Sequence, residues 1–296
     1  MAIFALYHDN EHLSRGLITF FMKKENNNEI LANLKLGQET FSRNIGLSKQ
    51  VYFGLTYEDI TRYTGIPQPT MLSYDKYWVS PYISIAKQIA ELYCADLDTL
   101  CQKDIGFYIV EQLAILKRFI ERVAGDYVAV KNRMSDWIDK QSHVEEFGIY
   151  EELCNQLQVE IGRLNKEERA VNINRDEGVA ENFTRNFNNL HKNLGISYRK
   201  ISSALDISIG NLTRLKKGGE PMLETVIKLS AFFGVSIEDM IASNPNFNYE
   251  HLQQEVGKFN IRFGEFPPEG LYFYAHKRAN ILTKEQAKKF VEELLS

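Results

Sequence analysis

Residues 183–240 read FTRNFNNLHKNLGISYRKISSALDISIGNLTRLKKGGEPMLETVIKLSAFFGVSIEDM. Apolar side chains recur in this stretch every three or four positions, and glycines or small polar residues interrupt them at short intervals. This pattern predicts five short helices in succession, each beginning at a capping residue and ending at a glycine or a tight turn. The residues that mark the helix ends are Gly195, Ser197, Asp206, Ser208, Gly218, Gly219, Pro221, Gly234 and Ser236.

The second and third of these helices are short, have apolar inner faces and are joined by a tight turn at Asp206 and Ile207. Two helices joined in this way are typical of a helix-turn-helix unit, whose second helix is free to enter a groove of DNA. The charge agrees, because residues 185–219 carry seven basic side chains and one acidic side chain, whereas the whole chain has a net charge of −4. A basic segment in an acidic chain indicates contact with a polyanion.

This stretch resembles the lambda-repressor-like, or XRE, family of helix-turn-helix proteins, and four motifs carry the resemblance. They are F-x-x-N-x-x-x-L at 183–190, G-I-S at 195–197, I-S-x-x-N-L-T-R-L-x-x-G at 207–218 and L-x-x-F-F-G-V-S-I-E-D-M at 229–240. The resemblance implies that the helix beginning at Ser208 is the recognition helix and that the partner is double-stranded DNA.

On that basis, side chains around the recognition helix divide into those that read bases and those that hold phosphates. Arg214 suits guanine O6 and N7, whereas Ile209 or the Thr213 methyl suits a thymine methyl. The candidate base contacts are Ile209, Asn211, Thr213 and Arg214. The candidate backbone contacts are Lys192, Tyr198, Arg199, Lys200, Ser208, Lys216 and Lys217. Backbone contacts position the protein without specifying sequence. The alternative for each residue is a solvated helix surface.

Residues 40–102 repeat the pattern of the later stretch, at an offset that falls from 142 to 140 positions. Residues 41–45 correspond to 183–187, 54–60 to 195–201, 65–71 to 206–212, and 89–98 to 229–238. We interpret this segment as a second, degenerate helix-turn-helix copy. The alternative is a coincidental similarity between two helical segments.

The two copies differ in charge and therefore in expected role. Glu58 stands where the later stretch has Arg199, and an acidic side chain weakens phosphate binding. Gln68 and Thr70, however, lie at the start of the corresponding recognition helix, where an amide suits adenine. Two roles stay open: a second DNA-reading surface with Gln68 and Thr70 as base contacts, or a surface that faces another protein.

Residues 103–170 are expected to form a helical segment between the copies. Its last part carries apolar residues at alternating spacings of three and four, which predicts a heptad seam. The seam residues are Phe147, Tyr150, Cys154, Leu157, Ile161 and Leu164. Such a seam would join two chains into a homodimer and set the half-site spacing. The alternative is an amphipathic core helix within one chain.

The ends of the chain carry weaker signals. Within residues 1–39, His8, Glu11 and His12 match the H-x-x-E-H motif of inverted zinc proteases, but no third ligand motif follows and a polar turn is the alternative. Residues 244–296 are expected to form a small α+β extension. A short helix and a strand are expected within 251–266, β structure at 270–275, and a final helix after Thr283.

Composition limits the class of protein. With 44% hydrophobic residues among 296, the chain can bury substantial cores. Its three cysteines have no C-x-x-C spacing, which favours a reducing cytosol. The apolar runs near the start are too short to cross a bilayer, so we expect neither secretion nor membrane insertion.

Together these patterns predict a mainly α protein with lambda-repressor-like helix-turn-helix domains at 40–102 and 178–243. The expected function is a non-enzymatic, cytoplasmic, sequence-specific transcriptional regulator of bacterial or phage type, repressor-like and without a cofactor. A peptide or protein regulator is a further candidate partner. The first alternative is an antirepressor or scaffold whose helix-turn-helix domains bind another protein. A zinc hydrolase built on His8, Glu11 and His12 is the remote alternative.

Overall fold

The structure, a computed structural model, describes residues 27–47, 49, 55–105, 173–176 and 178–265, with isolated positions at 115, 118, 132, 133, 135, 136, 139, 140, 159, 288, 289 and 292. This part of the chain is mainly helical, as predicted, and its β pairings are two isolated bridges. The chain divides into two units, Met1–Ala32 and Asn33–Ser296. The contacts described below lie within the second unit.

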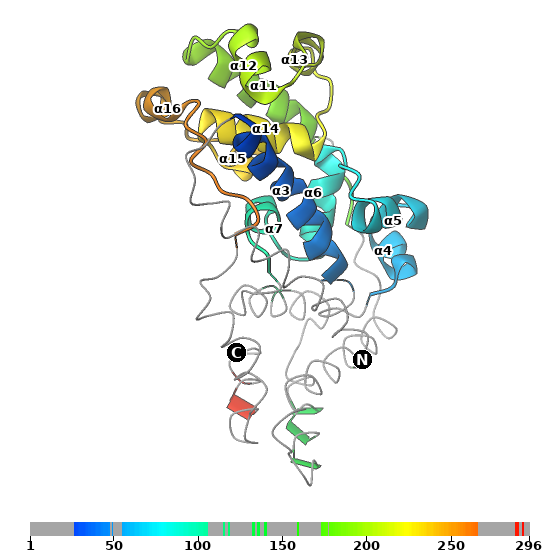
Figure 1. The fold of residues 1–296 in the computed structure, drawn as a ribbon. Helices are drawn as coiled ribbons and strands as arrows, with labels where there is room; N and C mark the ends of the chain where they lie inside the picture. The colour runs from blue at the N-terminus through cyan, green and yellow to red at the C-terminus, as the bar shows by residue number, and fades with distance from the viewer. Residues whose placement is uncertain are drawn as a thin grey trace. The chain divides into compact units, whose positions relative to one another are not determined.

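Five helices between residues 178 and 241 follow the predicted order (Figure 1). They are α11 (Gly178–Asn193), α12 (Tyr198–Leu205), α13 (Ile209–Lys216), α14 (Leu223–Phe233) and α15 (Ile237–Ile241). The predicted caps are confirmed, because the hydroxyls of Ser197, Ser208 and Ser236 each accept a hydrogen bond from the backbone N–H three residues later. We call these helices the C-terminal set.

Aromatic side chains of α11 form the core of the C-terminal set. Phe183 and Phe187 have no exposed surface, and their rings stack with centroids 5.9 Å apart. The Phe187 ring also meets the edge of Phe233 at 6.3 Å and lies 6.2 Å from the ring of Tyr198. Because Tyr198 is the first residue of α12, these contacts place that helix on the core.

Asn186 ties α11 to the end of α15. Its amide nitrogen donates to the carbonyl oxygens of Asp239 and Met240, both at 3.2 Å, and of Ala242 at 2.8 Å. The last carbonyls of a helix have no partner within it, and a buried side-chain donor replaces the water that they would otherwise bind. The asparagine of the F-x-x-N-x-x-x-L motif therefore closes the bundle.

We expect Asn186→Ala to lower the free energy of unfolding by about 2 kcal/mol, because buried carbonyls lose their donor. Urea denaturation measures the loss. Asn189→Ala on the exposed side of the same helix is the matched control and should change stability by less than about 0.5 kcal/mol. Equal losses in both variants would contradict the closing role of Asn186.

A second run of five helices lies between residues 27 and 102. They are α3 (Asn27–Leu47), α4 (Tyr57–Thr64), α5 (Gln68–Lys76), α6 (Ile83–Leu92) and α7 (Leu97–Gln102). The predicted segment began at residue 40, but α3 starts well before it and buries Leu34 as well as Phe41 and Ile45. We call these helices the N-terminal set.

The N-terminal set has its own closing asparagine and its own caps. The amide nitrogen of Asn44 donates to the carbonyl oxygens of Leu100 at 2.8 Å and Lys103 at 2.7 Å, beside the end of α7. Thr56 caps α4 through a reciprocal capping box with Asp59. Helix α4 ends at Gly65 with φ 71°, a left-handed conformation that favours glycine.

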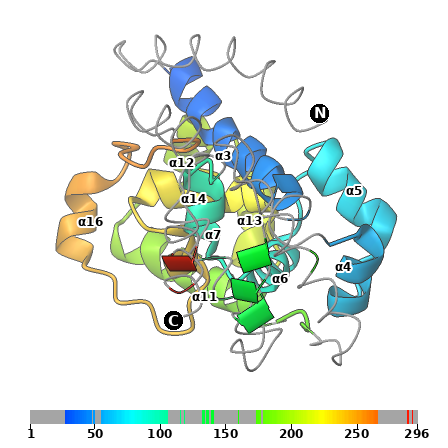
Figure 2. The same ribbon diagram turned by 90° about the horizontal axis from the view of Figure 1, so that it is seen from below.

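The two sets contact each other between α6 and α14, which are labelled in Figures 1 and 2. Helices α7 and α15 also contact each other. Within the expected extension, a helix is present as α16 (Tyr249–Glu255) and begins two residues before the expected range. The expected strand is absent from residues 251–265, where Glu265 forms only an isolated bridge, and residues 270–275 lie outside the described residues.

The segment after α16 packs on both sets. Its Phe259 ring lies 6.0 Å from that of Phe232 in α14. Further on, the buried Phe263 approaches Gly37 of α3 so closely that a Cβ there would lie 2.9 Å from its Cδ1 atom. Residues 257–265 therefore belong to the core shared by the two sets.

Candidate nucleic-acid interface

Helices α12 and α13 contact each other through apolar side chains and leave their polar faces outside. Ile201 and Leu205 of α12, with Leu212 and Leu215 of α13, have no exposed surface. The turn between the helices is set by Asp206, whose φ of 53° is the left-handed conformation that aspartate tolerates better than most residues. Burial on one side thus fixes α13 while its other side faces solvent.

The exposed side of α13 carries the predicted base-reading residues in an ordered arrangement. The Ile209 side chain is 46% exposed at the first turn of the helix. Asn211 Oδ1 accepts hydrogen bonds from Arg214 Nε at 3.2 Å and Nη2 at 3.1 Å. The Thr213 hydroxyl donates to the Ile209 carbonyl at 2.8 Å. The helix therefore presents a methyl-rich start followed by an amide and a guanidinium held together.

Arg214 also reaches past the end of α13. Its Nη1 atom donates to the Glu220 carbonyl oxygen at 3.0 Å, and its side chain lies over Gly219, where a Cβ would lie 2.7 Å from Arg214 Cγ. The absence of a side chain at Gly219 therefore leaves room for the Arg214 side chain along the loop. A contact from Arg214 to a base requires exchanging these hydrogen bonds for hydrogen bonds to the base.

Five cationic side chains surround α13 and are solvent-exposed. They are Lys192, Arg199, Lys200, Lys216 and Lys217. None of them forms a salt bridge within the part of the chain that the structure describes. Cations without a nearby acid keep their charge available for a polyanion.

A hollow of about 500 Å³ lies beside these cations. It is lined by Asn188, His191, Lys192, Gly195, Ile196, Ser197 and Lys216. The His191 ring lies 4.2 Å from that of Tyr198, and burial, together with nearby Lys216, lowers the pKa of His191. The hollow thus combines a neutral imidazole, two cations and the N-terminus of α12, groups that suit an anionic oxygen.

Tyr198 differs from the other predicted backbone contacts. Its hydroxyl oxygen is buried and makes no hydrogen bond to any described residue, and burial raises the pKa of the phenol. The Lys216 Nζ atom lies 5.9 Å from the ring centroid. The ring supports the cation, and a phosphate contact by the hydroxyl requires the ring to turn outward.

The predicted base contacts of the N-terminal set lie on α5. Gln68 is exposed and Thr70 is partly exposed at the start of this helix, after Pro67 in the N-cap position. A proline is tolerated at the start of a helix because its missing N–H would have no partner there. Glu58, on α4, is exposed as well.

A family model described as "Helix-turn-helix" matches residues 191–240. These residues are therefore similar to a helix-turn-helix domain of the XRE type. The matched residues cover α12, α13 and α14 and most of α15, and they contain all eleven base and backbone contacts predicted for the C-terminal set.

The match does not extend to the rest of the chain. Comparison with curated proteins and with solved structures gave no match. The helix-turn-helix domain is of a kind that typically binds DNA and carries no enzymatic activity. What the remaining residues do is therefore argued from their own contacts.

The other predicted sites lie outside the described residues. This holds for the H-x-x-E-H motif and for the six residues of the heptad seam, which both stay predictions. Among the residues that the structure does describe, no group of three or more potential ligands is placed to hold a metal ion. Within that same part of the chain, no helix is long and apolar enough to span a membrane.

Sequence reasoning missed His191 as a member of the interface. Its spacing from Tyr198 and Lys216 carries no recognised motif, since the three residues come from three different helices or their ends. Only packing of α12 against α11 and α13 brings their side chains together.

Proposed function

We propose that this protein is a sequence-specific, double-stranded DNA-binding transcriptional regulator whose α13 enters the major groove. One observation carries the proposal: five exposed cations without an acidic partner among the described residues surround the exposed side of α13. DNA binding needs such cations, because neutralising phosphates releases counterions and supplies much of the affinity.

In the proposed complex, α13 reads bases and its surroundings hold the phosphates. Arg214 suits a guanine and the exposed Ile209 side chain suits a thymine methyl. Lys192 and Lys216, which both line the hollow, would bind one phosphate together with the N–H groups at the start of α12. Resemblance to lambda-repressor-like proteins supports a repressor of bacterial or phage type.

We also propose that the N-terminal set is a second, degenerate helix-turn-helix copy. Asn44 and Asn186 make equivalent bonds to the ends of α7 and α15. Thr56 and Ser197, at equivalent positions, both cap the helix that precedes the turn. The asparagine hydrogen bonds and the hydroxyl caps are shared by the two sets at the offset that the sequence repeat predicts. A coincidental similarity between two helical segments would not place them at the same offset.

Selection from random duplex DNA tests the proposed function. We expect the full chain to enrich a defined sequence, and Arg214→Ala to relax the preference at one base pair, at a cost of about 1 to 3 kcal/mol in discrimination. Lys228→Ala, a cation on α14 that is paired with Glu224, is the matched control and should leave the enriched sequence unchanged. Absence of any enriched sequence would refute the proposal.

DNA affinity should rise as the pH falls, through protonation of His191. In the free protein, burial and Lys216 lower the pKa of His191, so the ring is neutral at pH 7. A phosphate in the hollow would raise that pKa, and binding then takes up a proton. The gain in DNA affinity is complete at pH values below the pKa of His191 in the free protein. It is absent at pH values above the pKa of His191 in the complex. Each unit of difference is worth about tenfold in affinity.

Fluorescence anisotropy with a labelled duplex, between about pH 5 and pH 8 at constant ionic strength, measures this dependence. His191→Gln should remove it, whereas His251→Gln on the exposed surface of α16 should leave it unchanged. The same pH dependence in the His191→Gln variant would show that another group takes up the proton.

A protein-binding role is the second candidate, and one observation favours it. Tyr77, Trp78 and Val79, which follow α5, are 72%, 47% and 44% exposed. Large apolar side chains grouped on a surface mark interaction sites more often than chance. If this role were the main one, Arg214→Ala together with Lys217→Ala would leave function intact, whereas Trp78→Ala would not.

A further inference from the structure

The loops that follow α5 and α13 meet in a reciprocal pair of hydrogen bonds. The backbone N–H of Ile83 donates to the Pro221 carbonyl at 3.0 Å, and the N–H of Leu223 donates to the Pro81 carbonyl at 2.8 Å. Tyr82 and Met222 form the antiparallel bridge between them. Pro81, Tyr82 and Ile83 lie 140 positions before Pro221, Met222 and Leu223, which is the offset of the sequence repeat.

The first turns of α6 and α14 repeat this reciprocity. Neither helix has a side-chain cap of its own. Instead, the N–H of Ser84 donates to Glu220 Oε1 at 3.2 Å, and the N–H of Glu224 donates to Ser80 Oγ at 3.0 Å. Each set therefore caps the helix of the other, again with partners at equivalent positions.

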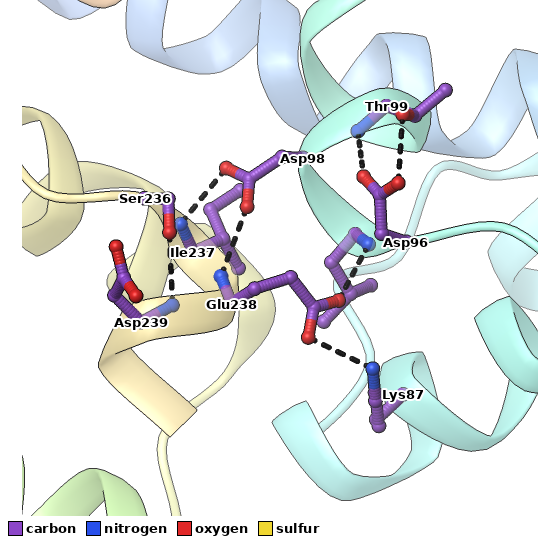
Figure 3. Close-up of polar contacts among 9 residues, drawn as sticks. Lys87, Asp96, Asp98, Thr99, Ser236, Ile237, Glu238 and Asp239 are labelled. Atoms are coloured by element: carbon purple, nitrogen blue, oxygen red, sulfur yellow. Dashed lines mark hydrogen bonds and ion pairs between the residues drawn. The ribbon is translucent and has the colours of Figure 1, made fainter. Parts of the chain in front are cut away.

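Helices α7 and α15 exchange caps in the same way (Figure 3). Asp98 Oδ1 accepts from the N–H of Ile237 at 2.8 Å and Oδ2 from that of Glu238 at 3.0 Å. In return, Glu238 Oε1 accepts from the N–H of Leu97 at 2.8 Å. Lys87 Nζ, 2.8 Å from Glu238 Oε2, offsets part of the negative charge.

An interface is isologous when every contact occurs twice, related by a two-fold axis. If residue i of one half contacts residue j of the other, the counterparts of i and j in the opposite halves make the same contact. Here both halves belong to one chain. Height along the axis is unchanged by a two-fold rotation, so the counterparts α5 and α13 lie on the same side of the pair. Tyr82 and Met222, at the axis, remain 47% and 39% exposed, so this surface is open to solvent.

The two halves differ at the position of the hollow beside His191. Lys49, Tyr57 and Asp75 stand in the N-terminal set where His191, Tyr198 and Lys216 stand in the C-terminal set. Lys49 Nζ lies 3.1 Å from Asp75 Oδ2 and 3.5 Å from the Tyr57 ring centroid, and the side chains of this ion pair are 7% and 6% exposed. The Tyr57 hydroxyl donates to the same carboxylate oxygen at 2.6 Å.

This closed ion pair changes what the N-terminal set can hold. Its cation is neutralised by a buried carboxylate, whereas Lys216 and Lys192 in the C-terminal set face solvent. The exposed surface of α4 adds Glu58 where α12 has Arg199. Among the described residues, the N-terminal half therefore has fewer cations at these positions than the C-terminal half, although Lys76 stands where the C-terminal half has Lys217. It keeps base-reading candidates in the exposed Gln68 and the partly exposed Thr70.

We propose that one chain is a covalent pseudo-dimer that binds duplex DNA with two unlike half-sites, a strong one under α13 and a weak one under α5. This inference rests on the proposed function. It places within one chain the two reading helices that a homodimer would supply from two chains, and the predicted heptad seam is not part of this pairing. The DNA that fits it is non-palindromic, with half-site centres about one helical turn apart.

The test combines selection with stoichiometry on the full chain. We expect selection to enrich a duplex with two different half-sites, and light scattering after size exclusion to show one chain per duplex. In the Gln68→Ala variant, base preference should be lost at the weaker half-site only. A palindromic site that binds two chains would overturn the pseudo-dimer. A single half-site, unaffected by Gln68→Ala, would overturn the role of α5. Absence of any enriched sequence would instead refute the proposed function itself.

A gain-of-affinity variant tests the weak half independently. Glu58→Arg places a cation where α12 has Arg199, and should tighten binding about tenfold at low salt, with a steeper salt dependence by about 0.9 for one new phosphate contact. Glu250→Arg on the exposed surface of α16 makes the same charge change and is the control. Equal affinities for the two variants would show that α4 does not face the DNA.

Discussion

Reversing the charges of Arg199 and Lys200 together is expected to weaken DNA binding by about 100-fold, since each reversal should cost about 1.4 kcal/mol or more at a phosphate contact. Both residues lie in the first turn of α12, next to Ser197 at the edge of the hollow. Acidic side chains are well tolerated in the first turn of a helix, so the fold should be unaffected. Anisotropy titrations at several salt concentrations measure the effect.

The salt series separates phosphate contacts from a general charge effect. The magnitude of the slope of log affinity against log salt concentration should fall by about 1.8, which corresponds to the loss of two phosphate contacts. Lys35→Glu with Lys258→Glu changes the net charge equally and reverses exposed cations of α3 and of the segment after α16. If this control pair weakens binding as much as the reversal on α12, the proposed interface is wrong.

Phe187→Ala should produce the largest loss of stability, about 3 to 5 kcal/mol, because it removes a fully buried ring from a packed core. The ring contacts Phe183, Tyr198 and Phe233 and has no exposed surface. A loss of this size is a large share of the stability of a typical domain. Urea denaturation, followed by circular dichroism, measures it.

The matched control is Phe247→Ala, since this ring is partly exposed and packs against Tyr249 at 6.1 Å. Its loss should be about 1 kcal/mol or less. If the two variants lost equal stability, the stack on α11 could not be the main core of the C-terminal set. DNA binding by the Phe187 variant should fall as well, because Tyr198 loses the ring that positions α12.

Most of the C-terminal set could be predicted from local sequence, because its helix ends depend on residues close in the chain. Ser197, Ser208 and Ser236 cap helices through N–H groups three residues away, and Gly234 ends α14 in the left-handed conformation. The start of α14 was predicted at Pro221 but lies at Leu223. Its first turn depends on Ser80, far away in the sequence.

The candidate site was predictable in part for the same reason. Exposure of the cations around α13 follows from the charge and apolar pattern of two adjacent helices. The pairing of Arg214 with Asn211 and with the Glu220 carbonyl does not, because rotamers and loop path decide it. The ion pair between Lys49 and Asp75 does not follow from local sequence either, because the two residues lie far apart in the chain.

The sequence alone determined that this chain contains a basic helix-turn-helix and a more acidic segment of similar pattern, because helix periodicity, caps and charge are properties of neighbouring residues. Only the tertiary structure decided that the two segments face each other through reciprocal hydrogen bonds. The bonds that do so join Ser80 to Glu224 and Asp98 to Glu238, at separations of about 140 residues that no local pattern records. Unsatisfied N–H groups at helix starts are what require these partners, and the fold supplies them from the opposite set.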